Sequence, residues 1–166
     1  MRILVAGMGN VLHADDGFGV AVADRLAQRP LPDGVDLVEV GIGGIHLVQH
    51  LHAGYDGLVI VDAVDRGGEP GTVYLLEATV PQIADYSEEE RHQYMTDIHY
   101  TVPSKVMIVA QALGCLPDRV WIVGCQPLET EKVQIGLSSV VEQAVAIAEQ
   151  RILELVSSLA VEEAKT

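Results

Sequence analysis

The sequence predicts a three-layer α/β fold, in which helices cover both faces of a twisted, mostly parallel sheet of about five strands. Short aliphatic runs such as residues 3–6 and 58–61 lack the apolar and polar alternation of half-exposed strands. They are therefore typical of strands buried on both faces of a parallel sheet. Segments with helical spacing of apolar residues separate these runs, and strands that alternate with helices imply right-handed crossovers.

The expected strands differ in how much polar sequence they contain. Residues 3–6, 58–61 and 120–123 are continuous apolar runs, which predicts burial on both faces. Residues 35–40 and 73–76 alternate more between apolar and polar side chains, which is typical of less central or edge strands.

Four helices are expected, at residues 17–28, 45–52, 103–113 and 139 to about 159. Pro103 suits a first helical turn, and Gly114 is a typical stop after a helix. Ser139 and Glu142 have the spacing of a capping box. The stretch 85–100 is the least regular, and we expect a loop or a loosely packed helix there.

Length and composition favour one domain, over residues 1–160, followed by a polar tail at 161–166. With 166 residues, of which 49% are hydrophobic, the chain can bury a core without disulfides or a structural metal. Only Cys115 and Cys125 occur, which fits a reducing cytoplasm. The apolar run at the N-terminus is interrupted from Gly7 onward, too early for a signal peptide or a membrane span, so we expect a cytoplasmic location.

The acidic composition limits the possible partners. With a formal net charge of −14, a phosphate-binding surface would form against the field of the whole molecule, so we expect neither nucleic acid nor a membrane as partner. An acidic surface suits a metal ion or a basic protein segment. Excess carboxylates can equally serve only to keep a protein in solution.

Carboxylates follow two of the buried runs, where an open α/β sheet binds its ligands. Asp15 and Asp16 come shortly after the first strand, and Asp62 directly follows residues 58–61. An Asp at a helix N-terminus can cap free amides and interact with the positive end of the helix dipole. Such capping would explain one aspartate of the adjacent pair but would leave the other without a structural role. Asp62 could form a turn, yet Ala63 after it is not a turn residue, which favours a functional role.

Gly7 and Gly9 at the end of the first strand invite a dinucleotide-binding interpretation. The third glycine of that fingerprint would fall on Leu12, and Asp15 and Asp16 occupy the helix start where a phosphate would bring its own negative charge. A nucleotide-binding protein is therefore the weakest of the alternatives.

The histidines offer one further candidate ligand. His46 and His50 have a spacing that could chelate a metal, but Leu47 replaces the glutamate of a zinc protease, and an ordinary helix surface is favoured. His99 lies just ahead of the expected helix at Pro103, from where it could reach the strand ends, although a solvated loop histidine is slightly more common at such a position. Two carboxylates and one imidazole suit Ni²⁺, Zn²⁺ or Fe²⁺, and the same groups can activate water.

These residues lie in motifs that resemble the hydrogenase maturation proteases, endopeptidases that trim the C-terminal extension from the large subunit of [NiFe] hydrogenases. The matching segments are residues 7–19, 60–63, 70–72, 124–127 and 135–138, together with His99. The resemblance therefore spans roughly residues 1–150. The opening motif followed by the strand-end aspartate is its most specific part.

The resemblance implies that Asp16, Asp62 and His99 form a metal site and act in catalysis, by recognising the nickel already inserted in the precursor. Nickel would then be supplied by the substrate, with no tightly bound resident cofactor, and the partner would be a hydrogenase large-subunit precursor. Whether hydrolysis is of the aspartic type or metal-dependent is left open, as is the nucleophile. The leading alternative is a non-catalytic, metal-sensing chaperone of the precursor that uses the same three residues.

The chain departs from the family pattern after its second strand. Many relatives carry an aspartate where this chain has Val40. The neighbouring Glu39 would face the other side of an alternating strand, so we do not expect it to substitute. The pattern that follows resembles one subgroup of the family, which suggests a different partner hydrogenase rather than a loss of activity.

Overall fold

The protein is described by a computed structural model, which covers residues 1–80, 87–89 and 103–163. Its sheet contains β1 (Ile3–Met8), β2 (Val35–Gly41), β3 (Gly57–Ala63), β4 (Val73–Glu77) and β5 (Arg119–Cys125). The strands lie in the order β2-β1-β3-β5-β4, and all are parallel except β4, which runs antiparallel to β5. The predicted five-stranded, mostly parallel sheet is confirmed. The two segments with the most polar alternation, β2 and β4, form its edges.

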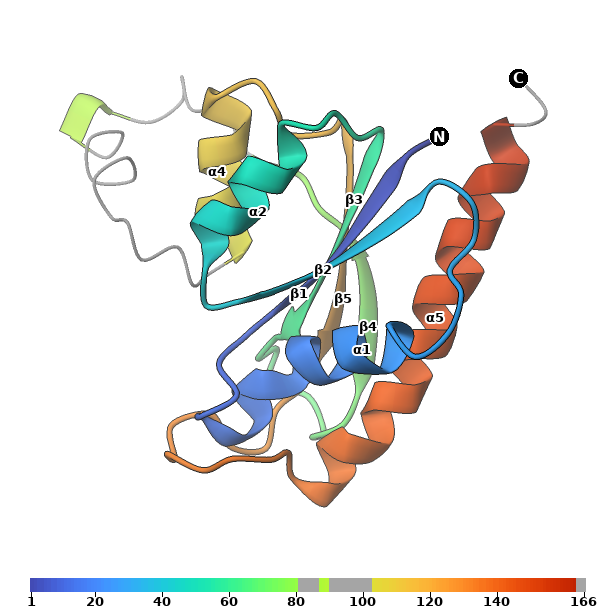
Figure 1. The fold of residues 1–166 in the computed structure, drawn as a ribbon. Helices are drawn as coiled ribbons and strands as arrows, with labels where there is room; N and C mark the ends of the chain where they lie inside the picture. The colour runs from blue at the N-terminus through green and yellow to red at the C-terminus, as the bar shows by residue number, and fades with distance from the viewer. Residues whose placement is uncertain (81–86, 90–102, 164–166) are drawn as a thin grey trace.

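Helices cover both faces of the sheet, as the sequence predicts (Figure 1). The helices are α1 (Phe18–Leu26), α2 (Gly44–Leu51), α4 (Pro103–Ala112) and α5 (Ser139–Glu163). One face carries α1 and α5, and the other carries α2 and α4 (Figure 1). The stretch 85–100 falls almost wholly outside the described residues, so the expectation for it stays a prediction.

Alternate residues of the central strands pack into two separate cores. Ile3 and Val5 of β1 pack with α1 and α5, whereas Leu4 and Ala6 pack with α2 and α4, and all four are at most 2% exposed. Successive side chains of a strand point to opposite faces, so an uninterrupted apolar run is what a sheet with two covered faces requires. Burying one such aliphatic side chain contributes about 1.5 to 3 kcal/mol.

The last helix is longer than the sequence suggests. α5 ends at Glu163 and not near Leu159, and Ile152, Val156 and Leu159 lie on its buried stripe. The predicted polar tail at 161–166 stays a prediction. Among the described helices, none combines the length and the apolar composition that crossing a membrane requires.

The chain order creates a topological switch point between β1 and β3, where the chain reverses its direction across the sheet. From β1 the chain moves outward through α1 to β2, and from β2 it returns through α2, past β1, to β3. Such a reversal of direction leaves the carboxyl ends of the two inner strands free to hold a ligand. Gly19 allows α1 to approach this point closely, because a Cβ there would overlap the carbonyl oxygens of Met8 and Val61.

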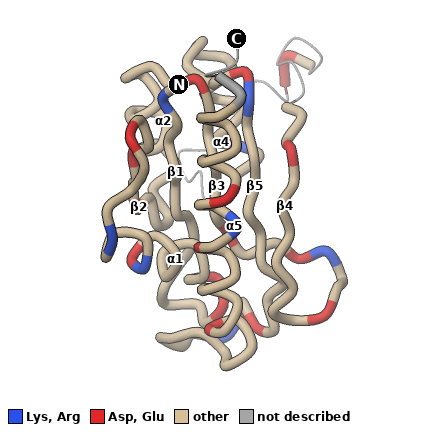
Figure 2. The backbone as a smooth tube through the Cα atoms, turned by 90° about the vertical axis from the view of Figure 1, so that its right-hand side faces the viewer, with Lys and Arg blue, Asp and Glu red and all other residues tan. Residues whose placement is uncertain are grey.

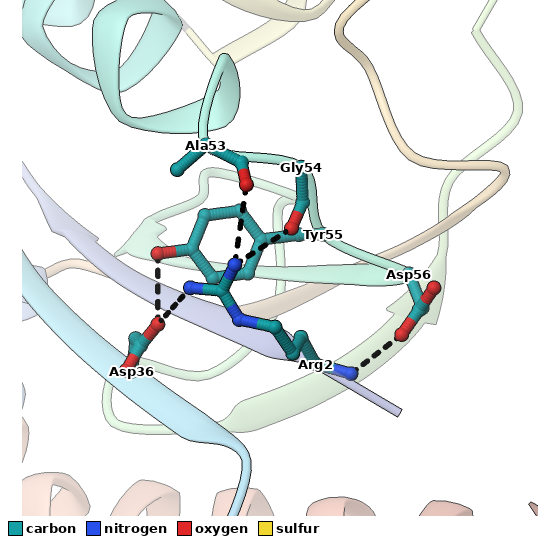
Figure 3. A network of polar contacts seen from close by, with 6 residues as sticks. All are labelled: Arg2, Asp36, Ala53, Gly54, Tyr55 and Asp56. Atoms are coloured by element: carbon teal, nitrogen blue, oxygen red, sulfur yellow. Dashed lines mark hydrogen bonds and ion pairs between the residues drawn. The ribbon is translucent and has the colours of Figure 1, made fainter.

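The opposite end of the sheet is tied together by Arg2 (Figure 3). Its guanidinium pairs with Asp36 of β2 at 2.8 Å, donates to the carbonyl of Ala53 at 3.1 Å and lies 4.6 Å from the ring centre of Tyr55. Its backbone N–H donates to Asp56 at 2.6 Å. These contacts join the beginnings of β1, β2 and β3, away from the carboxyl ends where the candidate site lies.

Candidate functional site

The structure brings two of the three predicted site residues together at the switch point between β1 and β3. Asp16 lies in a short 3-10 turn, η1 (Ala14–Gly17), that follows the loop after β1, and Asp62 lies near the end of β3. The two carboxylates are close enough for the charge of Asp16 to raise the pKa of Asp62. Residues 46 apart in the sequence therefore form one acidic site because β1 and β3 are neighbours in the sheet.

Asp62 is buried, with only 6% of its surface exposed. Burial, followed by the charge of Asp16, raises the pKa of Asp62 to about 8, while a hydrogen bond of 2.9 Å donated by the Ala63 N–H acts in the opposite direction. None of the ion pairs formed among the described residues includes Asp62. A buried carboxyl group with a raised pKa at a switch point of the sheet is a candidate functional group, because packing alone gives no reason to bury a carboxyl group there.

The turn after β1 wraps around these two carboxylates. The Asn10 N–H donates a hydrogen bond of 2.9 Å to Asp16. Gly9 has a φ of +124°, and a Cβ there would overlap the Asp16 carbonyl oxygen and lie 3.6 Å from Asp62 Oδ1. Gly9 thus lets the backbone of the turn at Asp16 approach the end of β1 closely. The position of the two carboxylates argues against a phosphate in this turn.

Asp15 has a structural role that differs from that of Asp16. It is fully buried, and its carboxylate accepts hydrogen bonds from the N–H groups of Leu128, Glu129 and Ser138 at 2.9, 3.1 and 2.6 Å, and from the Ser138 hydroxyl at 2.9 Å. The alternative that one aspartate of the pair caps its own helix does not hold, because neither η1 nor α1 has a side-chain cap hydrogen bond. Asp15 instead satisfies amides of the loop between β5 and α5, which leaves Asp16 for the site.

A buried glutamine after β5 positions another loop at the same end of the sheet. Gln126 is 5% exposed, and its side-chain oxygen accepts hydrogen bonds from the N–H groups of Arg66 and Gly68 at 2.7 and 3.1 Å. Its side-chain nitrogen donates to Asp65 at 2.8 Å. Gln126 and Ser138 lie in segments that match the family motifs, but the sequence predicted no role for either. The usable signal was a polar residue in a motif directly after a buried strand.

The remaining candidate ligands are histidines. His99 lies outside the described residues, so its place in the site stays a prediction. His46 and His50 are exposed on α2, as predicted for an ordinary helix surface. No group of three or more His, Cys, Asp or Glu side chains suited to a metal occurs within the described part of the chain, which includes Asp16 and Asp62 but not His99.

Val40 and Cys125 lie near the carboxyl ends of β2 and β5. Val40 is buried in the core against α2, and Glu39 is exposed, so the two do face different surroundings, as the alternation argument requires. Burial raises the pKa of the Cys125 thiol to about 11, which argues against a role for it as a reactive nucleophile.

Comparisons with known proteins agree on one family. A family model described as hydrogenase maturation protease matches residues 20–155. The hydrogenase expression/formation protein HupD of Rhizobium leguminosarum is 37% identical over 132 residues, which is 78% of this chain and 61% of that protein. The chain therefore spans about three fifths of the length of that relative.

Two further proteins match almost over their full length. The coenzyme F420 hydrogenase subunit delta of Methanothermobacter thermautotrophicus is 34% identical over 162 residues, with 92% of this chain and 93% of that protein covered. The solved structure of the hydrogenase maturating endopeptidase HybD from E. coli superimposes with a TM-score of 0.74 at 30% identity, covering 95% of this chain and 93% of that one.

Proposed function

The chain belongs to the hydrogenase maturation protease family, and we propose that it is an endopeptidase that removes the C-terminal extension of a [NiFe] hydrogenase large-subunit precursor. We further propose that it acts after nickel insertion and recognises the nickel of its substrate. The observation that carries this proposal is the buried carboxyl group of Asp62 beside Asp16 at the switch point of the sheet.

The charge of the site supports a cation as the feature that is recognised. The negative charge of Asp16 disfavours ionisation of Asp62, so a divalent cation that contacts both would offset the repulsion between them and the burial of Asp62. Carboxylate oxygens with one imidazole are a suitable ligand set for Ni²⁺. In this proposal the family resemblance supplies His99 as the third ligand, and the metal belongs to the substrate.

Recognition through the metal gives a reason for cleaving at the right stage of assembly. A precursor without nickel would place no positive charge between Asp16 and Asp62, and would therefore bind less tightly than the loaded precursor. Binding through the metal would also hold the scissile peptide near carboxyl groups that can move a proton to or from water.

The proposal is tested by incubating the protein with nickel-loaded precursor and following the shift in size of the large subunit. We expect Asp16→Asn, Asp62→Asn and His99→Ala each to slow processing by about two orders of magnitude, through loss of a metal ligand. Asp56→Asn, at the opposite end of the sheet, is the matched control and should process at the wild-type rate. Wild-type rates in all three site variants would show that the site is wrongly assigned. Binding of the precursor without any cleavage would instead favour the metal-sensing chaperone.

A further inference from the structure

Large apolar side chains are exposed beside the candidate site, on two loops that meet. We define the apolar rim as five residues of these loops: Val11, Leu12, Leu128, Val133 and Ile135. Val133 and Ile135 are 78% and 79% exposed, and the other three are between 46% and 61% exposed. The rim flanks the turn that carries Asp16, at the end of the sheet where the loops after β1 and β5 lie together (Figure 1).

The two loops are joined through their backbones. The Gln134 N–H donates to the Leu12 carbonyl at 2.9 Å, and the Ala14 N–H donates to the Gln134 carbonyl at 2.8 Å. These bonds form a short parallel bridge between residues 13 and 134. Val133 and Ile135, on either side of Gln134, are therefore held beside the first loop.

Hydrogen bonds to two carboxylates also hold the loop between β5 and α5. Asp15 accepts hydrogen bonds from residues near both of its ends, and the Glu129 carboxylate accepts from the N–H groups of Glu131 and Lys132 at 2.9 and 3.1 Å. A backbone fixed in this way loses little conformational freedom when a partner binds. Exposed apolar side chains on such a fixed backbone are typical of a surface that binds another molecule.

A small pocket beside the rim shows what kind of side chain would fit. Its volume is about 220 Å³, and Val11, Val20 and Ile135 contribute apolar side chains to its lining. Asp24 and Glu142 also line it, and no Lys or Arg does. The volume is below the roughly 300 to 1,000 Å³ of small-molecule sites, but it suits one side chain with an apolar stem and a cationic head, such as Lys or Arg.

The loops around the apolar rim are mostly acidic, like the lining of the pocket. The loops after β1 and β5 contain Asp15, Asp16, Glu129 and Glu131 against a single basic residue, Lys132. Acidic positions at this end of the molecule are visible in Figure 2. Together with the net charge of −14, they would attract a basic segment and repel an acidic one.

We propose that the apolar rim and its pocket dock a segment of the hydrogenase precursor in which apolar side chains are flanked by Lys or Arg. This identification of the partner rests on the proposed function, whereas the surface itself does not. Docking beside Asp16 would add affinity and orientation that the substrate's metal alone does not provide.

The test uses the double variant Val133→Ser/Ile135→Ser, because both side chains are exposed and their loss should leave the fold intact. With nickel-loaded precursor as substrate, we expect KM to rise on the order of tenfold while kcat stays within about twofold. The matched control is Ile147→Ser, an apolar residue 48% exposed on α5, which should keep the wild-type KM. Binding of the wild type and the same variants to immobilised, nickel-loaded precursor is measured separately.

A second variant tests the charge of the partner. In the wild type, KM should rise with salt, because exposed charge pairs are screened. Asp24→Asn/Glu142→Gln should raise KM at low salt and flatten this dependence.

Each part of the proposal has its own contrary result. Equal KM values for the rim variant and the Ile147→Ser control, in a protein that cleaves, overturn the docking surface but leave the endopeptidase intact. An unchanged salt dependence in Asp24→Asn/Glu142→Gln overturns the basic partner. Binding that needs Val133 and Ile135 in a wild type that never cleaves supports the docking surface and overturns the proteolytic function.

Discussion

Asp62 makes the folded protein less stable than its packing would allow. Its pKa in the folded protein, about 8, lies above the usual value of about 4 for an Asp, so the folded state holds a proton that the unfolded state releases between these values. The free energy of unfolding must therefore fall as the pH rises through that window. A cost of this kind at a single buried side chain is typical of sites kept for function.

The pH dependence gives a direct prediction for Asp62→Asn. Compared with the wild type, the metal-free variant should have a clearly higher melting temperature at about pH 8, where the unfolded state is stabilised by ionisation of Asp62. At about pH 4 the increase should be much smaller. Calorimetry at the two pH values measures the difference. Asp65→Asn is the control, because hydrogen bonds from Gln126 and the Gly67 N–H lower the pKa of Asp65, so its loss should not stabilise at the higher pH. An equal gain from Asp62→Asn at both pH values would contradict the burial argument.

Gly9 supports the site through the absence of a side chain. Gly9→Ala should lower the melting temperature and slow processing, because the new Cβ would overlap the Asp16 backbone carbonyl oxygen and displace the turn that carries Asp16. Gly114→Ala separates this effect from backbone strain, since Gly114 also has a positive φ, +68°, but a Cβ there meets nothing within 4 Å. Both variants lose about 1 kcal/mol to the left-handed conformation. Only Gly9→Ala should lose activity, and normal processing by it would show that the turn can adapt.

The loop between β5 and α5 depends as an element on one carboxylate. Asp15→Ala would leave the N–H groups of Leu128, Glu129 and Ser138 without their acceptor, which should cost about 3 kcal/mol or more in the free energy of unfolding. Ser138→Ala removes only the hydroxyl bond and should cost about 1 kcal/mol. Urea unfolding measures both. Amide hydrogen exchange of residues 127–138 should rise in the Asp15 variant.

A helix serine provides the reference for that series. The Ser158 hydroxyl bonds to a carbonyl three residues earlier in α5, so Ser158→Ala should change stability little. If Asp15→Ala were no more harmful than Ser158→Ala, the loop would have to be held mainly by its bridge to the loop after β1.

At the scale of the whole molecule, the two ends of the sheet have different roles. The end at Arg2 is joined by complementary charges and hydrogen bonds that connect three strands (Figure 3). The opposite end collects like charges, a buried carboxyl group and exposed apolar side chains. Parallel strands make this separation possible, because all their carboxyl ends reach the same edge.

Much of the fold is readable in the sequence because burial on a strand is a local property. The run at residues 3–6 has no polar position, so both of its faces must be covered, and helices must lie on each side. The polar alternation of β2 and β4 gave their edge positions for the same reason. Asp62 stood out because it is a charged residue at the end of an apolar strand.

By itself, the sequence determined the class of fold, the inner and outer strands, and Asp62 with the Asp15–Asp16 pair as candidate site residues. The tertiary structure decided which aspartate of the adjacent pair is structural, because the partners of Asp15 lie more than a hundred residues away at Leu128 and Ser138. It also decided the pKa of Asp62 and the exposure of Val133 and Ile135. Apolar periodicity records only which face of an element is buried, whereas hydrogen-bond partners, desolvation and exposure depend on which distant loops come together.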